Sequence, residues 1–112
     1  MKRQLRTHIW VRTPKLFSKV KIDTILYCHS NCGRTTIFQQ DKPQMATLES
    51  LSTMEKKLSS HHFFRCHRAY LVNLEYVEHI IEKAPAAVMT DNICIPIARN
   101  RKELFLEKLM PV

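Results

Sequence analysis

The stretch FFRCHRAYLVN, residues 63–73, places strong cations inside a segment that otherwise resembles the core of a β-sheet. Its cationic or potentially cationic side chains are Arg65, His67 and Arg68, and no acidic residue lies among them. Phe, Tyr, Leu and Val favour strands and burial, whereas unpaired charges are rarely buried. We therefore expect Tyr70 and the two residues after it to be core, Asn73 to form a cap or turn, and the cations to project from a turn.

Positive charge dominates the whole chain. Lys and Arg total 18 against 10 Asp and Glu, a formal net charge of +8, and the first acidic residue is Asp23. Such a balance suits a polyanionic partner, of which nucleic acid is the commonest. The alternative is a solvated basic face without a specific partner.

Length and hydropathy limit the class of protein. A chain of 112 residues is expected to be one domain, spanning residues 1–112. No apolar run approaches the roughly 18 residues of a membrane span, and the basic start MKRQLRTHIW lacks the apolar core of a secretory signal. We therefore expect a cytoplasmic protein without membrane insertion.

Four cysteines occur, at positions 28, 32, 66 and 94. A reducing compartment disfavours disulfides, and a zinc site normally needs paired ligands at closer spacing. His29 and His67 each lie beside a cysteine, so a metal site stays an alternative, although we expect none. Cys66 and Cys94 are expected to be small buried apolar residues.

The first half of the chain predicts strands and one helix. Strands are expected at residues 8–12 and 16–22, the latter with Phe17, Val20 and Ile22 as possible inward positions. Residues 24–40 predict a β-hairpin, because Gly33 in its turn is free to adopt a positive φ. A short amphipathic helix is expected within residues 46–60, with Thr47 as its N-cap and a buried stripe of Leu48, Leu51, Met54 (or Glu55) and Leu58.

The second half predicts more short strands and a terminal helix. Strands are expected within residues 76–83, 87–90 and 93–97, separated by turn signals. A helix is expected within residues 98–110, with Arg101 and Lys102 in its first turn and with Leu104, Phe105 and Leu109 (or Leu106) facing inward.

A β-rich protein that recognises DNA must do so without a recognition helix, through loops or ribbons. Arg is the best reader of guanine in the major groove, because its guanidinium donates two hydrogen bonds. Three turns present suitable groups: residues 31–35, 65–68 and 99–101.

Three blocks of the sequence carry a family resemblance. FFRCHRAYLVNLEYVEHI (residues 63–80), IDTILYCHSNCGRTTIF (residues 22–38) and IPIARNRKELFLEKL (residues 95–109) closely resemble the signature segments of the LytTR DNA-binding domain family. The resemblance extends over about residues 8–110, with the blocks at matching distances. Cys28 and His29 depart from the family pattern in the hairpin.

The resemblance implies a mainly β fold, with about ten short strands in small antiparallel sheets and two or three short helices. It implies a transcriptional regulator that binds double-stranded promoter DNA, usually at direct repeats, through loops that enter successive major grooves. Most such domains follow a receiver domain in response regulators of two-component systems. An upstream receiver domain or a homodimer on DNA is therefore an expected partner, and no cofactor is implied.

The resemblance also assigns roles to individual residues. Base reading falls on Arg34 or Thr35 in the hairpin, on Arg68 and on Arg99, while Asn31, Arg65, Asn100 and Arg101 would contact phosphates or position the loops. His67 is either bonded to backbone or in contact with DNA, and Arg65 has a salt bridge to Glu75 or Glu78 as its alternative. The candidate DNA-binding residues are therefore Asn31, Arg34, Thr35, Arg65, His67, Arg68, Arg99, Asn100 and Arg101.

Two other functions are less consistent with the sequence. Cys66 next to His67 suggests a nucleophile and base, but neighbours on a strand point to opposite faces and no glycine suited to an oxyanion hole is near. We therefore expect no catalytic activity. A protein- or membrane-interaction module that uses the basic face is the main alternative, and it would bind DNA without sequence preference.

Overall fold

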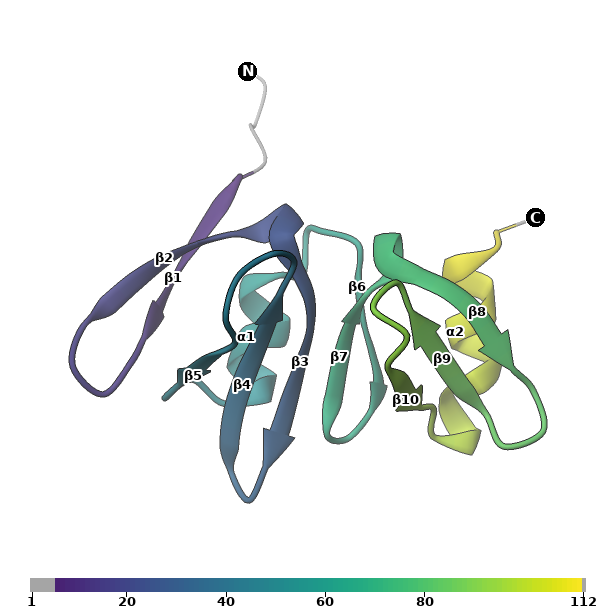
Figure 1. Cartoon of the computed structure of the whole chain (residues 1–112). Helices are drawn as coiled ribbons and strands as arrows, with labels where there is room; N and C mark the ends of the chain where they lie inside the picture. Colours follow the sequence, from purple (N-terminus) through teal and green to yellow (C-terminus); the bar gives the residue numbers. More distant parts are fainter. Residues whose placement is uncertain (1–5, 112) are drawn as a thin grey trace.

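The computed structural model describes residues 6–111, so Lys2 and Arg3 of the basic start lie outside the described residues (Figure 1). Within them the chain forms ten strands in three antiparallel sheets, two α-helices and three short 3-10 helices, which confirms the mainly β fold. The strands are β1 (His8–Arg12), β2 (Phe17–Lys21), β3 (Ile25–Asn31), β4 (Arg34–Gln39), β5 (Met45–Thr47), β6 (Phe63–His67), β7 (Tyr70–Asn73), β8 (Val77–Ile81), β9 (Ala86–Met89) and β10 (Cys94–Pro96). The helices are η1 (Ile22–Thr24), α1 (Leu51–Lys57), η2 (Leu74–Tyr76), η3 (Arg99–Arg101) and α2 (Lys102–Leu109).

A five-stranded sheet with the order β5-β4-β3-β7-β6 lies at the centre of the fold. Its middle strand, β3, is buried on both faces over Ile25 to Cys28. A strand covered on both faces needs an apolar run rather than a strict alternation, and ILYC supplies one. The sheet therefore separates two core clusters.

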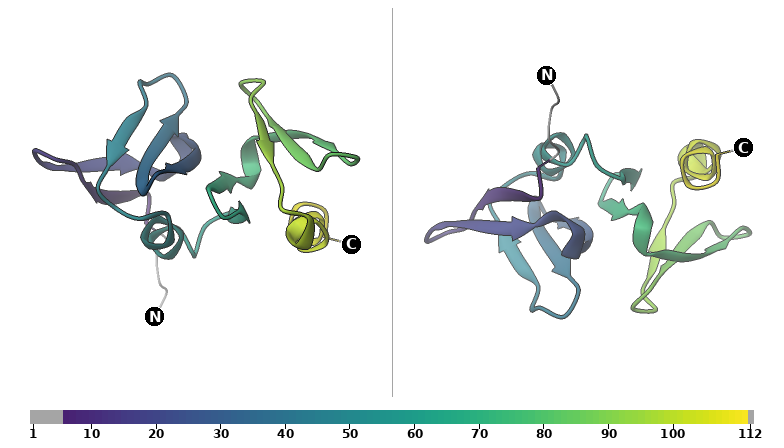
Figure 2. Two further views of the ribbon diagram at one scale, coloured as in Figure 1. Left: turned by 90° about the horizontal axis from the view of Figure 1, so that it is seen from below. Right: turned by 90° about the horizontal axis from the view of Figure 1, so that it is seen from above.

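Each core cluster is closed by elements from one part of the chain. On one side, Ile9, Val11 and Val20 of the β1–β2 sheet pack with Leu51 and Met54 of α1. On the other, Phe105 of α2 packs with the inward residues of β6, β7, β9 and β10, and its ring stacks on Phe64 at 5.2 Å. Figures 1 and 2 show the result: β1–β2 lies at one end of the molecule, and β8, β9 and α2 lie at the other.

The predicted β3–β4 hairpin is confirmed, with a two-residue turn between Asn31 and Arg34. Both turn residues have positive φ, 53° at Cys32 and 80° at Gly33. Two consecutive positive φ values are the mark of a type I′ turn, whose twist matches that of paired strands. Gly33 meets this requirement without strain, whereas Cys32 is a non-glycine residue in a left-handed conformation.

The first helix begins later than the sequence predicts. Ser50 is the N-cap, since its hydroxyl oxygen accepts a hydrogen bond from the Thr53 N–H at 3.0 Å. The prediction of Thr47 was wrong because Thr47 belongs to β5, where its hydroxyl donates to the Arg12 carbonyl at 2.7 Å. Leu48 consequently precedes the helix and is 60% exposed, while the rest of the predicted stripe, with Met54 rather than Glu55, is buried.

The terminal helix also begins later, because residues 99–101 form the separate turn η3. Lys102 is in its first turn as predicted, whereas Arg101 precedes it. Phe105 is fully buried and Leu109 packs against the core, but Leu104 is 39% exposed, so its inward assignment was wrong. Leu104 directly precedes the buried Phe105, so it lies about 100° around the helix from that ring and faces solvent.

Two further burial predictions were wrong. Cys66 is buried as expected, but Cys94 is exposed because it lies in β10, the edge strand of the three-stranded sheet, and points outward. Phe17 is 61% exposed, since it pairs with Arg12 on the outer face of β1–β2, opposite the buried Val20.

Candidate nucleic-acid interface

Three loops lie along one edge of the molecule: the β3–β4 turn, the β6–β7 turn and the connection from β10 to α2 (Figure 1). Backbone hydrogen bonds join each loop to the next. The Ser30 N–H donates to the Ala69 carbonyl at 2.9 Å, and the Ala98 N–H donates to the Cys66 carbonyl at 2.9 Å. The three segments proposed from sequence therefore form one continuous surface.

In the β3–β4 turn only one of the two alternative base readers is accessible. Arg34 is exposed, as is Asn31 opposite it. Thr35 is fully buried, because side chains alternate along β4 and its hydroxyl points into the interior. Thr35 is therefore unavailable to DNA in this structure, and Arg34 is the candidate at this tip.

Arg65 organises the β6–β7 turn. Its Nε donates to the His67 carbonyl at 3.2 Å, and a terminal nitrogen donates to the Arg68 carbonyl. The same guanidinium forms a salt bridge with Glu55 of α1 at 3.1 Å, not with Glu75 or Glu78 as the sequence suggested. Because all of these partners belong to the protein, this side chain holds the turn in shape.

His67 also stabilises this turn, as the structural alternative proposed. Its Nδ1 accepts a hydrogen bond from the Ala69 N–H at 3.1 Å, so that nitrogen carries no hydrogen and Nε2 is the donor of the neutral ring. Arg68, at the tip of the turn, is exposed. Arg68 is therefore the exposed guanidinium of this turn, and the side chains of Arg65 and His67 hold the backbone of the turn in place.

The third loop is attached to the second by Arg101. Its Nε donates to the Arg65 carbonyl at 3.1 Å, and its guanidinium lies 4.8 Å from the centroid of the Phe64 ring. Arg99 and Asn100 are exposed. No side chain caps the start of η3 within the described residues, and N–H groups at such a start are suited to phosphate oxygens.

The second and third loops enclose a shallow hollow of about 400 Å³. Its lining residues are mostly basic or polar and include no carboxylate: Arg65, His67, Arg68, Ala98, Asn100 and Arg101. Five of the predicted contact residues thus line one hollow, although they come from segments separated by about 30 residues in the chain.

Sequence reasoning missed the aromatic support beneath these loops. His29 of β3 stacks on Tyr70 of β7 at 4.3 Å, and Tyr70 also contacts His67 edge-on at 5.8 Å. Tyr27 stacks on Phe38 at 4.5 Å in the same layer. No spacing rule reveals these contacts, because β3 pairs with β7 across about 40 intervening residues.

The structure places Cys66 and His67 differently from a catalytic pair. Cys66 is fully buried and its thiol donates to the Pro96 carbonyl with a sulfur–oxygen distance of 3.6 Å, while His67 faces the turn. Burial raises the pKa of the Cys66 thiol to about 12, so the thiolate is scarce at neutral pH. Residues 6–111 contain no cluster of three or more metal-ligating side chains, and no helix among them has the length and hydropathy to cross a membrane.

Comparison with known proteins identifies relatives of this chain. The family model described as the LytTr DNA-binding domain matches residues 16–110. A sensory transduction protein LytR from Staphylococcus saprophyticus is 29% identical over 93 residues, which cover 80% of this chain and 36% of that protein. The chain therefore spans about a third of the length of this relative.

A solved structure has the same architecture. It is the LytTr DNA-binding domain of a Bacillus cereus protein described as a methyl-accepting/DNA response regulator. The two superpose with a TM-score of 0.79 over 94% of this chain and 98% of that chain, at 18% identity. At this identity the match concerns the fold alone.

Proposed function

The chain belongs to the LytTR family of DNA-binding domains, and from this premise we propose that it recognises a specific double-stranded DNA sequence through its three adjoining loops. The observation that supports the proposal most directly is that each loop presents one exposed arginine, Arg34, Arg68 or Arg99. Each guanidinium is suited to donate two hydrogen bonds to a guanine edge in the major groove. No carboxylate lies in the three turns to neutralise these charges.

The remaining candidates divide into two roles. Asn31 and Asn100 are exposed beside the arginines and are assigned to phosphate or sugar contacts. Arg65, His67 and Arg101 are assigned to positioning, because their side chains already bond to loop backbone. Such contacts orient the reading side chains and add little sequence information of their own.

The wider biological role follows from the family and is part of the proposal. In this proposal, about residues 8–110 form one DNA-binding domain of a cytoplasmic transcriptional regulator. Its target would be a promoter with direct repeats, and a receiver domain upstream would make it a response regulator. The relative from S. saprophyticus is itself named a sensory transduction protein, which supports a signalling context.

Selection of binding sites from random duplexes tests the proposal. One enriched motif is expected, and Arg34→Ala, Arg68→Ala and Arg99→Ala should each weaken binding to it by roughly 1–3 kcal/mol and relax preference at a different base pair. Lys42→Ala is the matched control, since Lys42 is an exposed cation in the turn at the opposite end of β4.

One result would contradict the base-reading role of the arginines, and another would contradict sequence-specific DNA binding itself. If the arginine variants lose affinity equally for all sequences, these residues contact phosphates rather than bases. If no motif is enriched at all, the basic face serves a protein or membrane partner, as in the alternative function. Affinity should also fall steeply with salt, because counterions are released from the duplex.

A further inference from the structure

The two ends of the molecule carry surfaces of opposite character. The β1–β2 sheet turns one face to the core and the other to solvent, and the outward residues are basic or aromatic. This outer surface, called the hairpin face below, consists of His8, Trp10, Arg12, Phe17, Lys19 and Lys21.

The hairpin face combines exposed apolar area with positive charge. Trp10 is 57% exposed and Phe17 is 61% exposed, and the Arg12 guanidinium lies 5.3 Å from the Phe17 ring centroid. The strand register places Lys19 directly opposite Trp10. Large aromatic side chains that lie exposed together are typical of interaction surfaces.

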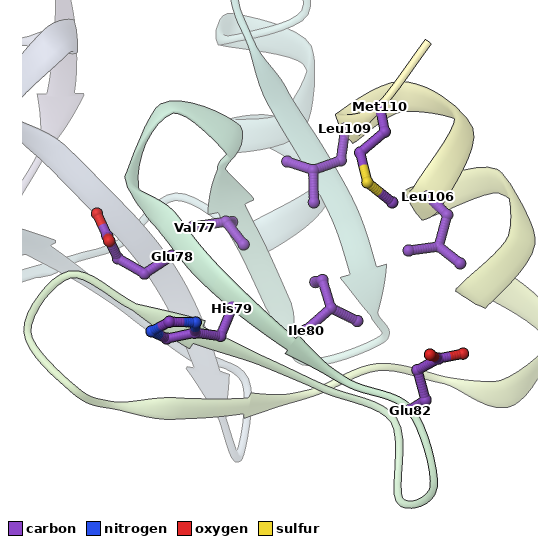
Figure 3. Close-up of a pocket in the computed structure, with 8 residues that line it drawn as sticks. All are labelled: Val77, Glu78, His79, Ile80, Glu82, Leu106, Leu109 and Met110. Atoms are coloured by element: carbon purple, nitrogen blue, oxygen red, sulfur yellow. The ribbon is translucent and has the colours of Figure 1, made fainter. Parts of the chain in front are cut away.

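At the other end, β8 and α2 enclose a groove of about 560 Å³, called the acidic groove below (Figure 3). Its floor is apolar, and the charged lining residues are carboxylates without any Lys or Arg. The lining residues are Val77, Glu78, His79, Ile80, Glu82, Leu106, Leu109 and Met110.

The carboxylates of the groove are available to a partner. Glu82 lies 3.7 Å from Lys102, but its side chain is 78% exposed, and an ion pair in this setting contributes little. Glu78 is exposed and forms no salt bridge among the described residues. Figure 3 shows Glu82 on the side of the apolar residues, whereas the Glu78 side chain points away from them on the outer side of β8, so the two carboxylates flank the strand that forms one wall of the groove.

We propose that the hairpin face of one copy docks against the acidic groove of a second copy when both are bound to DNA in the same orientation; this inference rests on the proposed function. Figures 1 and 2 show β1–β2 at one end of the molecule and β8 and α2 at the other, with the three loops between them along one edge. Two copies on a direct repeat therefore bring unlike ends together.

A second copy fits these surfaces better in this arrangement than in a symmetric one. Lysines would face glutamates, and Trp10 or Phe17 would meet the apolar floor of the groove. A twofold dimer through either surface would instead oppose like charges. The contact is small, so it is expected to act only where DNA raises the effective concentration of the neighbour.

The DNA experiment uses duplexes that carry one or two copies of the motif selected as above, with the two copies in tandem at a series of spacings. At the favoured spacing, binding of the second copy should be about 5- to 150-fold tighter than binding to an isolated site. Lys19→Glu/Lys21→Glu and Glu78→Lys/Glu82→Lys should each abolish this enhancement. Combining all four substitutions in one chain restores complementary charge and the original net charge, so it should restore the enhancement.

Lys42→Glu/Lys56→Glu is the matched control for the lysine reversal, because both lysines are exposed and lie outside the two surfaces, and the variant changes the net charge by the same amount as Lys19→Glu/Lys21→Glu. Circular dichroism confirms that every variant is folded. Enhancement that survives either reversal, or that is absent in the parent protein at every spacing, would overturn the proposal. So would a failure of the fourfold variant to recover while it still binds a single site.

A measurement without DNA separates this proposal from the proposed function. At millimolar concentration and low salt, amide chemical shifts at β1–β2 and at β8–α2 should change on dilution. Each reversal variant alone should lose these changes, and an equimolar mixture of the two variants should recover them. If single sites show no sequence preference, the proposed function fails, and this measurement alone then decides whether the two surfaces meet.

Discussion

The guanidinium of Arg101 lies over the ring of Phe64, 4.8 Å from its centroid, and its Nε donates a hydrogen bond to the Arg65 carbonyl at 3.1 Å. These two contacts join the loop before α2 to strand β6. The loop that presents Arg99 is therefore held against the turn that presents Arg68, and the spacing between the two proposed base readers depends on a side chain that reads no base itself.

Arg101→Lys should weaken DNA binding and relax preference at the base pair assigned to Arg99, although the positive charge is retained. Lysine lacks the planar fork that both bonds the carbonyl and stacks on the ring, and loss of the stack should also lower the free energy of unfolding by about 0.5–1 kcal/mol. Fluorescence anisotropy with selected and mismatched duplexes measures the effect. Arg12→Lys is the control, since it disturbs the Arg12–Phe17 pair at the other end of the molecule; equal binding by Arg101→Lys and parent would contradict the positioning role.

Asn73→Ala should lower the free energy of unfolding by about 1–3 kcal/mol. Its Nδ2 donates to the Ile25 carbonyl at 2.9 Å, its Oδ1 accepts from the Glu75 N–H at 3.0 Å, and the residue is only 4% exposed. Alanine would leave a buried carbonyl unpaired and remove the cap of η2. Urea denaturation measures the change, with Gln44→Ala as an exposed control; a loss below about 0.5 kcal/mol would show that water replaces both bonds.

Cys32→Asn should raise the free energy of unfolding by about 0.5–1 kcal/mol. Cys32 adopts a φ of 53° in the type I′ turn, and asparagine tolerates this left-handed conformation better than cysteine does. Thermal denaturation is the measurement. Cys94→Asn is the contrast, because Cys94 is also exposed but lies in strand β10, where asparagine is disfavoured; a gain in both variants would mean that thiol removal, not turn geometry, is responsible.

Stability should decline as the pH rises above about 9. Burial raises the pKa of the Cys28 and Cys66 thiols from an ordinary value of 9.0 to about 12. Between these values the thiols stay protonated in the folded state and ionise in the unfolded state, so the unfolded chain binds fewer protons and stability is lost toward pH 12.

The measurement is urea denaturation at pH values from 8 to about 11. Cys28→Ala/Cys66→Ala should show a shallower loss of stability with pH than the parent protein, even if it is less stable at pH 8. Cys32→Ala/Cys94→Ala should follow the parent slope, because both of these thiols are exposed. Equal slopes in all three proteins would show that other groups, such as Tyr27, whose pKa burial raises to about 12, dominate the alkaline loss.

Elements whose signals are local were predictable. Gly33 between two strands of alternating or apolar character indicated the hairpin, and Leu51, Met54 and Leu58 at helical spacing indicated α1. The start of the first helix was not predictable, because a partner distant in the sequence decided it. Thr47 is as good a cap as Ser50 by residue type, but its hydroxyl is drawn to the Arg12 carbonyl of a strand 35 residues earlier.

The sequence by itself determined that the protein is β-rich and basic, with arginines in three separate turns, because these properties depend only on residue type and on neighbours along the chain. The tertiary structure alone decided that the turns adjoin, through the Ser30–Ala69 and Ala98–Cys66 bonds, and that Arg34 rather than Thr35 reaches the surface. It also placed β1–β2, which carries the hairpin face, at the opposite end of the molecule from β8 and α2, which line the acidic groove. The pairing of β3 with β7 and the packing of α2 create these relationships, and such long-range contacts leave no periodic trace in the order of the residues.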